Sequence, residues 1–207
     1  MATLCQIPAQ RGRPREFDMD VALAAALRVF WRNGYEGASL TELTQEMGIT
    51  KPSLYAAFGN KESLFRKAFE LYEREKLAYV GQALDAPTSR EVAERLLMSA
   101  IDMQASGCDP KGCLGVISAV TCGPEADSIR QEVLSRRLSS LKAMVDRFER
   151  AVSEGDLPAD IDPEALARYL SAIMQGLSVQ ARSGANCTEL GMIARTTLAL
   201  WPRTEGR

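Results

Sequence analysis

Apolar residues recur at intervals of three and four almost throughout this chain, and no other feature restricts its fold as strongly. Between Leu134 and Val152, for example, apolar side chains follow one another after 4, 3, 4, 3 and 4 residues. This spacing places side chains on one face of an α-helix, whereas a half-buried strand needs alternation at every second residue. The sequence nowhere sustains such alternation, so we predict an all-α fold.

Capping residues, glycines and prolines divide the chain into about nine expected helices. Ser, Thr, Asp and Asn side chains cap helix N-termini, and glycine commonly ends helices. Ser39 and Thr50 are caps of this kind, and Gly48 separates the two short helices that they begin. The expected helices cover about 18–33, 40–47, 51–58, 61–84, 89–106, 113–121, 125–154, 163–183 and 188–201.

The two short helices near the N-terminus can bury their apolar residues only by crossing closely. These residues are Leu40, Leu43, Met47, Ile49, Leu54 and Phe58. Gly48 lies at the turn, where a left-handed conformation or tight packing would favour glycine. With the first long helix as the third side of the core, this is a helix-turn-helix arrangement. Its second short helix, Lys51–Ala57, is predicted to enter a major groove of DNA.

Composition limits the classes of function that the chain can have. The 207 residues carry a net charge of -2 and include no histidine. Residues 1–67 hold nine Lys and Arg against seven Asp and Glu, and the acidic excess lies in the remainder, which suits a DNA-facing head on an acidic body. Without histidine the chain lacks the usual general base, a His-assisted nucleophile and any His-containing zinc site. We therefore predict a non-enzyme without a cofactor.

A segment near the N-terminus, about a quarter of the chain, resembles the head of the tetracycline-repressor (TetR) family. The matching motifs are Phe30, Asn33-Gly34-Tyr35, Ser39–Leu43, Gly48–Phe58 and Asn60–Glu62. The similarity runs nearly without a gap from Phe17 to Phe69, and it implies a homodimer that releases a palindromic operator when a small molecule fills the larger domain. The expected parts are a flexible basic arm (1–16), a DNA-binding head (17–67) and an effector-binding and dimerisation body, a helical bundle (68–207).

Carried over by position, the resemblance assigns DNA contacts to the second and third helices and to the start of the fourth. These residues are Ser39, Thr41, Thr50, Lys51, Pro52, Ser53, Tyr55, Ala56 and Lys61. Ser39 and Thr50 are also expected as helix caps, and the alternative for Tyr55 is a partly buried core position. Arg13 and Arg15 are candidates for contact with the adjacent minor groove, and the alternative for them is a solvated tail.

The last two helices are apolar on more than one side, which favours burial on two sides. Small residues at Ala172 and Gly176 would let a partner helix approach closely and form a four-helix bundle across a two-fold axis. The expected interface residues are Ala172, Ile173, Gly176, Leu177, Val179, Ile193, Thr197 and Trp201. The alternative is that these residues serve only the core of their own subunit.

Methionines in the central helices indicate where an effector pocket would be lined, because a flexible thioether adapts to irregular cavities. The candidate lining residues are Met98, Met103, Ile117, Met144, Phe148 and Met174. Arg95, Arg147 and Tyr169 are candidate anchors for a polar group of the ligand. The alternative is that the methionines are ordinary core residues.

Two of the five cysteines support a second functional hypothesis. Cys108 and Cys113 frame a loop between helices, so they could form a thiol redox switch or a soft-metal sensor. The alternative is that they are structural, since their spacing matches no tight zinc knuckle. A third hypothesis is an architectural DNA-binding protein without an effector, which the acidic body argues against.

The chain is expected in the cytoplasm and away from membranes. Its apolar runs end well before the ~20 residues that a membrane span requires, and residues 1–16 lack the apolar segment of a signal peptide. An odd number of cysteines in such a compartment indicates reduced thiols. The expected partners are double-stranded operator DNA, a second copy of the chain and a small-molecule effector.

Overall fold

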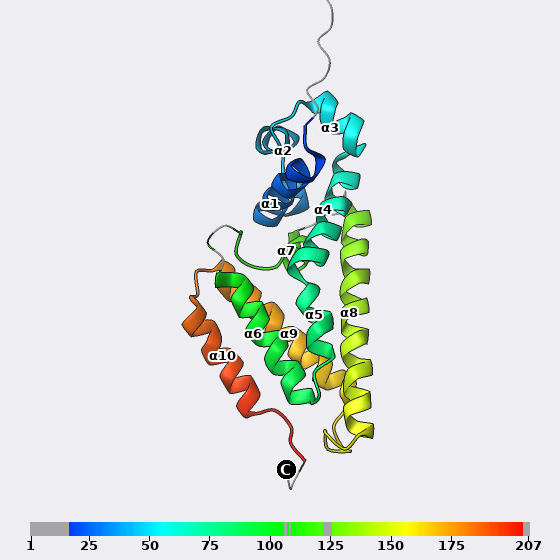
Figure 1. Ribbon diagram of the computed structural model, residues 1–207, viewed down its shortest axis with the longest axis vertical. Helices are drawn as coiled ribbons and strands as arrows, with labels where there is room; N and C mark the ends of the chain where they lie inside the picture. The colour runs from blue at the N-terminus through cyan, green and yellow to red at the C-terminus, as the bar shows by residue number, and fades with distance from the viewer. Residues whose placement is uncertain (1–16, 106, 108, 122–125, 205–207) are drawn as a thin grey trace, which may run out of the picture.

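A computed structural model describes residues 17–105, 107, 109–121 and 126–204 of the chain. Within these residues the secondary structure consists of ten α-helices and no strand, which confirms the all-α prediction. Three of the helices form a head at one end of an elongated molecule (Figure 1). They are α1 (Met19–Gly37), α2 (Leu40–Glu46) and α3 (Lys51–Phe58).

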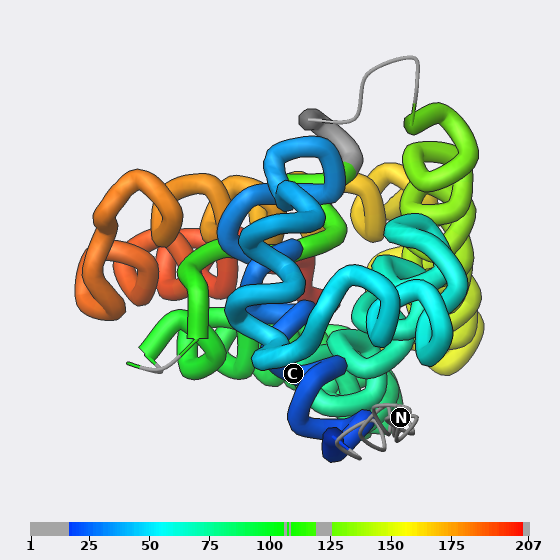
Figure 2. Tube along the Cα trace, turned by 90° about the horizontal axis from the view of Figure 1, so that it is seen from above, coloured from blue at the N-terminus to red at the C-terminus, as the bar shows by residue number. Residues whose placement is uncertain are grey.

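Helix α4 (Lys61–Lys76) begins in the head and continues into the body, so it belongs to both parts (Figure 1). The remaining helices are α5 (Ala78–Leu84), α6 (Ser89–Ala105), α7 (Leu114–Thr121), α8 (Asp127–Ser153), α9 (Pro163–Arg182) and α10 (Cys187–Ala199). Seen from above, α10 lies on one side of the body and α8 on the opposite side (Figure 2).

Two helix boundaries differ from those expected. The helix expected over 61–84 is divided at Leu77, whose φ of -108° and ψ of 5° leave helical geometry. The Leu77 side chain packs against the head core and lines a cavity of the body, so tertiary packing rather than a local sequence signal fixes this break. The first helix leaves helical geometry at Gly34 (φ 73°, ψ 179°), as predicted, and then adds a turn to Gly37.

The apolar core of the head continues without interruption into the body. Aromatic rings from α1 and α4 form its centre, and Trp31 lies edge-on to Tyr72 with ring centroids 4.8 Å apart. Leu114 of α7 and Ile129 of α8 belong to the same cluster. The buried Trp31 Nε1 donates a hydrogen bond of 3.1 Å to the carbonyl oxygen of Gly112, in the loop before α7. A second apolar cluster fills the lower body between α6, α8, α9 and α10.

Candidate DNA-binding head, effector cavity and pairing face

Helix α3 presents one face to solvent at the free end of the head. Lys51, Pro52, Tyr55 and Ala56 are exposed, whereas the side chains of Leu54 and Phe58 are buried among α1, α2 and α4. Tyr55 is 47% exposed, so the alternative of a core position is wrong. The two faces of this short helix therefore separate an apolar anchor from a set of polar and small side chains that a DNA groove could meet.

The caps of the short helices are those that the sequence predicts. Ser39 Oγ accepts a hydrogen bond of 3.1 Å from the backbone N–H of Glu42, and Thr50 Oγ1 accepts one of 3.3 Å from the backbone N–H of Ser53. The hydroxyls of Thr50 and Ser53 also share a hydrogen bond of 2.9 Å. Ser39 and its neighbour Thr41 are both exposed at the start of α2. Gly48, between the helices, has the positive φ (65°) that its turn requires.

The start of α4 places a cation beside the head surface. Asn60 caps the helix, since its Oδ1 accepts a hydrogen bond of 2.7 Å from the N–H of Ser63. Lys61 Nζ lies 4.6 Å from the ring centroid of Tyr35 and donates to the carbonyl oxygen of Glu36 at 3.4 Å. These contacts hold the ammonium next to a helix N-terminus, where the backbone N–H groups and the helix dipole both favour a phosphate. Arg13 and Arg15 lie outside the described residues.

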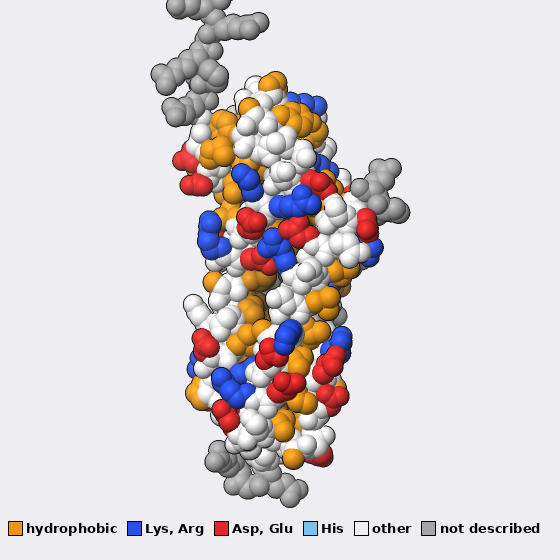
Figure 3. Space-filling view, turned by 90° about the vertical axis from the view of Figure 1, so that its right-hand side faces the viewer, with side chains coloured by type: hydrophobic (Ala, Val, Ile, Leu, Met, Phe, Trp, Pro, Cys, Tyr) orange, Lys and Arg blue, Asp and Glu red, His pale blue; other side chains and the backbone are white. Residues whose placement is uncertain are grey.

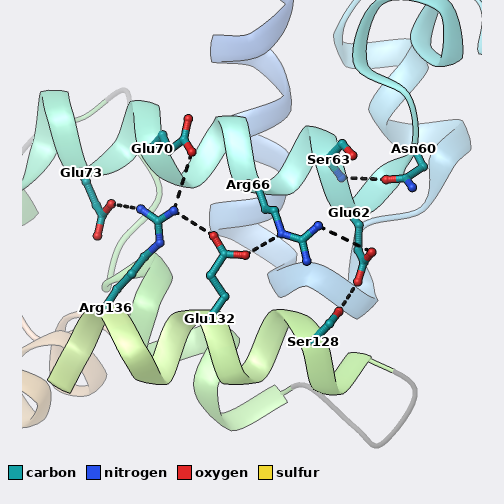
Figure 4. A network of polar contacts seen from close by, with 9 residues as sticks. All are labelled: Asn60, Glu62, Ser63, Arg66, Glu70, Glu73, Ser128, Glu132 and Arg136. Atoms are coloured by element: carbon teal, nitrogen blue, oxygen red, sulfur yellow. Dashed lines mark hydrogen bonds and ion pairs between the residues drawn. The ribbon is translucent and has the colours of Figure 1, made fainter. Parts of the chain in front are cut away.

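A chain of charged side chains joins α4 to α8 (Figure 4). Glu132 of α8 accepts hydrogen bonds from Arg66 of α4 at 2.6 Å and from Arg136 at 2.8 Å. Arg136 also pairs with Glu73 of α4, and the ring of Phe69 lies 5.5 Å below its guanidinium. At the head end of this network, the Ser128 hydroxyl donates to Glu62, which lies 3.7 Å from Arg66.

The network keeps its central carboxylate ionised. Burial alone would raise the pKa of Glu132, but the hydrogen bonds from Arg136 and Arg66 outweigh it and hold that pKa below its ordinary value. The hydrogen bond to Glu132 raises the pKa of Arg66, so both partners remain charged.

On the face formed by α4, α5 and α8, such charged side chains gather near the head, and hydrophobic atoms are visible at mid-height (Figure 3).

A mainly apolar cavity of about 150 Å³ lies in the body next to this network. Helices α4 to α9 all contribute to its wall, and Arg136 belongs to both the wall and the network. The apolar and sulfur-containing lining residues are Phe69, Leu77, Val80, Leu96, Ala100, Met103, Cys113, Val116, Met144, Met174 and Leu177. The polar ones are Glu73, Tyr79, Gln104, Arg136, Arg137, Ser140, Ser171, Gln175 and Ser178.

Half of the predicted pocket residues line this cavity. Met103, Met144 and Met174 do so, whereas the prediction is wrong for the other three. Met98 is 43% exposed on the outer side of α6. Ile117 is buried in the cluster that joins head and body, and Phe148 is buried against Trp201 with ring centroids 5.7 Å apart. Methionine content alone could not separate the cavity wall from the packed core.

The candidate ligand anchors have other roles. Arg147 donates to the carbonyl oxygens of Leu84, Ala86 and Pro87, so it holds the connection between α5 and α6. Arg95 forms an exposed pair with a glutamate one turn earlier on α6. Tyr169 is 42% exposed on α9 and does not line the cavity. The polar residues that do line it, such as Arg137 and Gln175, carried no distinctive sequence signal.

Cys113 is half-buried in the cavity wall, and its thiol interacts electrostatically with Tyr72 and Tyr79. Burial, followed by this thiol, raises the pKa of Tyr72 and of Tyr79 well above the ordinary value. Cys108, the other half of the proposed redox pair, lies outside the described residues. Among the residues that the structure does describe, no group of three or more His, Cys, Asp and Glu is arranged to hold a metal ion.

Helices α9 and α10 leave an apolar face uncovered. Ala172, Gly176 and Val179 of the predicted interface are exposed on α9, and Val179 is 54% exposed. Leu200, just after α10, is exposed as well, and so is Met192 on α10, which the sequence did not single out.

The other predicted interface residues face inward. Leu177, Thr197 and Trp201 are buried in their own subunit, so their assignment to a dimer interface is wrong. The Trp201 Nε1 donates to Ser89 Oγ at 3.4 Å, which ties the end of the chain to α6. Ile173 and Ile193 are half-buried and pack against the body core. For these residues the alternative of an internal core is the better description.

None of the described helices combines the length and the apolar character that a membrane crossing needs.

Comparison with known proteins supports this geometry over most of the chain. Residues 22–68 match the family described as bacterial regulatory proteins, tetR family, and residues 94–195 match the tetracyclin repressor-like C-terminal domain. The transcriptional repressor ComR of Escherichia coli is 36% identical over 203 residues, which cover 97% of this chain and 96% of ComR. The uncharacterized regulator YezE of Bacillus subtilis is 33% identical over 86% of this chain and 93% of its own length.

A solved structure of similar sequence contains DNA. It is a cysteine-substituted form of the TetR family regulator CifR in complex with a 26-base-pair double-strand operator. It has 42% sequence identity and a TM-score of 0.87, and the match covers 92% of this chain and 100% of that chain. The agreement thus extends through both the head and the body, and the chain belongs to the TetR family of helix-turn-helix transcriptional regulators.

Proposed function

We propose that this protein is a transcriptional repressor that binds a palindromic operator as a homodimer and leaves it when a small molecule enters the cavity. The observation that carries the proposal is the solvent-facing α3 on a head whose α4 continues into the cavity wall. The similarity to the repressor ComR and to CifR bound to operator DNA supports it. The redox or metal-sensing hypothesis is not favoured by these relatives.

In the proposed complex, α3 lies in the major groove. Lys51, Ser53 and Tyr55 bond to base edges or phosphates, and the Ala56 methyl group suits contact with a thymine methyl. Thr50 and Pro52 fix the start of the helix. Phosphates are contacted from the neighbouring helices by Ser39, Thr41 and Lys61, because these residues lie at or near N-termini and Lys61 carries a positive charge.

The pairing face in this proposal is the exposed apolar side of α9 and α10. Gly176 has no neighbouring atom within 4 Å of a Cβ placed on it, so a partner helix has room to approach there. Exposed Ala172, Val179, Met192 and Leu200 extend the same surface. Pairing two copies through this face would place two heads on successive major grooves, about 34–36 Å apart.

The DNA-binding proposal is tested with duplexes selected from a random library by the purified protein. We expect a palindromic consensus. Lys51→Ala should weaken operator binding and reduce the slope of log affinity against log salt by about 1, because one phosphate or base contact is lost. Lys142→Ala, which removes an exposed lysine from the body, is the matched control and should change neither quantity. Equal effects of the two substitutions would refute the assignment of α3 as the helix that contacts the operator.

The pairing face is tested by sedimentation of two variants. Val179→Glu places a charge in the proposed interface and should shift the protein from dimer to monomer at micromolar concentration. Val21→Glu introduces the same charge at a site that is 65% exposed in the head, and it should leave the dimer intact. If the Val179→Glu variant remains a dimer, this face is excluded as the dimer interface.

A further inference from the structure

The charged residues of the cavity wall do not balance one another. Three of them line the cavity: Glu73, Arg136 and Arg137. Glu73 pairs with Arg136, which is also bonded to Glu132. Arg137 makes no hydrogen bond or ion pair with any other described residue, although it is half-buried. Arg137 is therefore the one charged residue of the wall that forms no ion pair with a described group.

The neutral polar groups of the wall also include donors. Gln175 Nε2 donates to Ser171 Oγ at 2.9 Å, so the Ser171 hydroxyl keeps its own proton for another acceptor. Tyr79 also lines the cavity, and its phenol is protonated at neutral pH, since burial only raises its pKa further. A guanidinium and hydroxyl donors together suit an acceptor group, and a carboxylate can accept from several donors at once.

The size of the cavity limits the rest of the ligand. A cavity of about 150 Å³ is comparable to an engineered protein cavity that binds benzene. The remaining wall is mainly apolar, with Leu96, Ala100, Met144 and Met174 among its residues. A ligand of this size therefore has one apolar ring or short chain and room for a single small polar group.

From these observations we infer that the effector is a small monoanionic acid, a carboxylate on one apolar ring or short chain, and that Arg137 binds its carboxylate. The inference rests on the proposed function, because it identifies the chemical class of the molecule that fills the same cavity. It also assigns a separate role to each arginine of the wall. Arg136 holds α4 and α8 together through Glu73 and Glu132, and Arg137 selects the charge of the ligand.

Benzoate and benzamide are suitable probes, since they have nearly the same shape and differ in charge. Their affinities for the full-length protein are measured by titration calorimetry. The wild type should bind benzoate at least about tenfold more tightly than benzamide, as expected for a charge-assisted bond to arginine. Arg137→Gln should abolish this preference. The affinity for benzoate should fall at least about tenfold, and the affinity for benzamide should change by less than about threefold.

Arg150→Gln is the control, because it makes the same substitution on an exposed arginine of the same helix, away from the cavity. This variant should keep the preference for benzoate. Equal binding of both probes by the wild type, or a preference that survives Arg137→Gln, would overturn the inference and leave the cavity as a site for neutral effectors. Binding of neither probe would overturn it as well. The proposed repressor function is tested independently of this inference, because the measurement of Lys51→Ala on selected duplexes needs no ligand.

Discussion

Replacement of Glu132 by glutamine tests whether the network between α4 and α8 stabilises the protein more than ordinary surface ion pairs do. The substitution keeps the size of the side chain and removes the charge that Arg66 and Arg136 share. Both arginines and Glu132 are only about a third exposed, at 37%, 28% and 26% of their side-chain surface. At roughly 0.5–1 kcal/mol for each partly exposed pair, E132Q should lower the free energy of unfolding by about 1–2 kcal/mol.

Urea denaturation of the ligand-free protein measures this free energy. E91Q is the matched control, because Glu91 pairs with Arg95 on the same helix and both side chains are about half exposed. E91Q should cost at most about 0.5 kcal/mol. Since α4 also carries Asn60 and Lys61 at the head surface, E132Q, unlike E91Q, should alter operator affinity. Equal stability losses in the two variants would refute the reasoning that the network is more than a set of surface pairs.

Three further measurements test other parts of the structure. The pKa of Glu132 is lowered in the folded state, so its contribution to the free energy of unfolding is complete above the ordinary pKa near 4.3 and is lost as the pH falls through the folded-state pKa. The difference in unfolding free energy between wild type and E132Q should therefore shrink below about pH 4. Trp201→Ala should destabilise the subunit by about 3–5 kcal/mol, whereas Leu200→Ala, at a position 73% exposed, should cost little in a urea titration at low protein concentration. Gly48→Ala should lower the free energy of unfolding by about 1–2 kcal/mol, because Gly48 has a φ of 65°. Gly81→Ala, within α5, should raise the free energy of unfolding by up to about 1 kcal/mol. A change of the same sign in both variants would contradict the conformational argument.

Local chemistry determines most helix boundaries of this fold, and these boundaries could be predicted. Ser39 and Thr50 cap the helices that the sequence assigns to them, and the side chains of Asp18, Asn60 and Asp162 cap three further helices at the starts expected for them. Each cap is a hydrogen bond between residues two or three positions apart, so the necessary information is contiguous in the chain.

The break at Leu77 has a different origin. No Gly, Pro or capping residue stands there, and α5 begins without a side-chain cap. Leu77 instead packs against the core that head and body share, and it contributes to the cavity wall. A break that depends on distant residues leaves no local signal in one sequence.

The same distinction explains the outcome for the candidate sites. The outward face of α3 follows from the burial of Leu54 and Phe58, which periodicity reveals. On α9 and α10, periodicity shows that two faces are apolar but not which face packs on α6. Leu177 and Val179 illustrate the difficulty: they lie two positions apart, and one is 2% exposed and the other 54%. Only the packing of the body decides between a core role and an exposed one.

The cavity is joined to the head by two separate routes of contacts. One runs from Arg136 through Glu132 to Arg66 of α4. The other starts at Gln104 in the cavity wall, whose Oε1 accepts a hydrogen bond of 2.8 Å from the N–H of Gly112. The carbonyl oxygen of Gly112 in turn accepts the bond from Trp31 of α1.

The two routes predict different results when each is interrupted. Trp31→Phe keeps a smaller aromatic ring in the core and removes the indole N–H donor, so it interrupts the second route and leaves Glu132 untouched. If a ligand signals through α4 alone, this variant should release operator at the same ligand concentration as the wild type, while E132Q should not. If both helices must move together, each substitution should reduce the coupling free energy between ligand and DNA, and the double variant should reduce it by less than the sum. Since α1 and α4 are packed in one continuous apolar core, which resists relative displacement of its parts, we expect the second result.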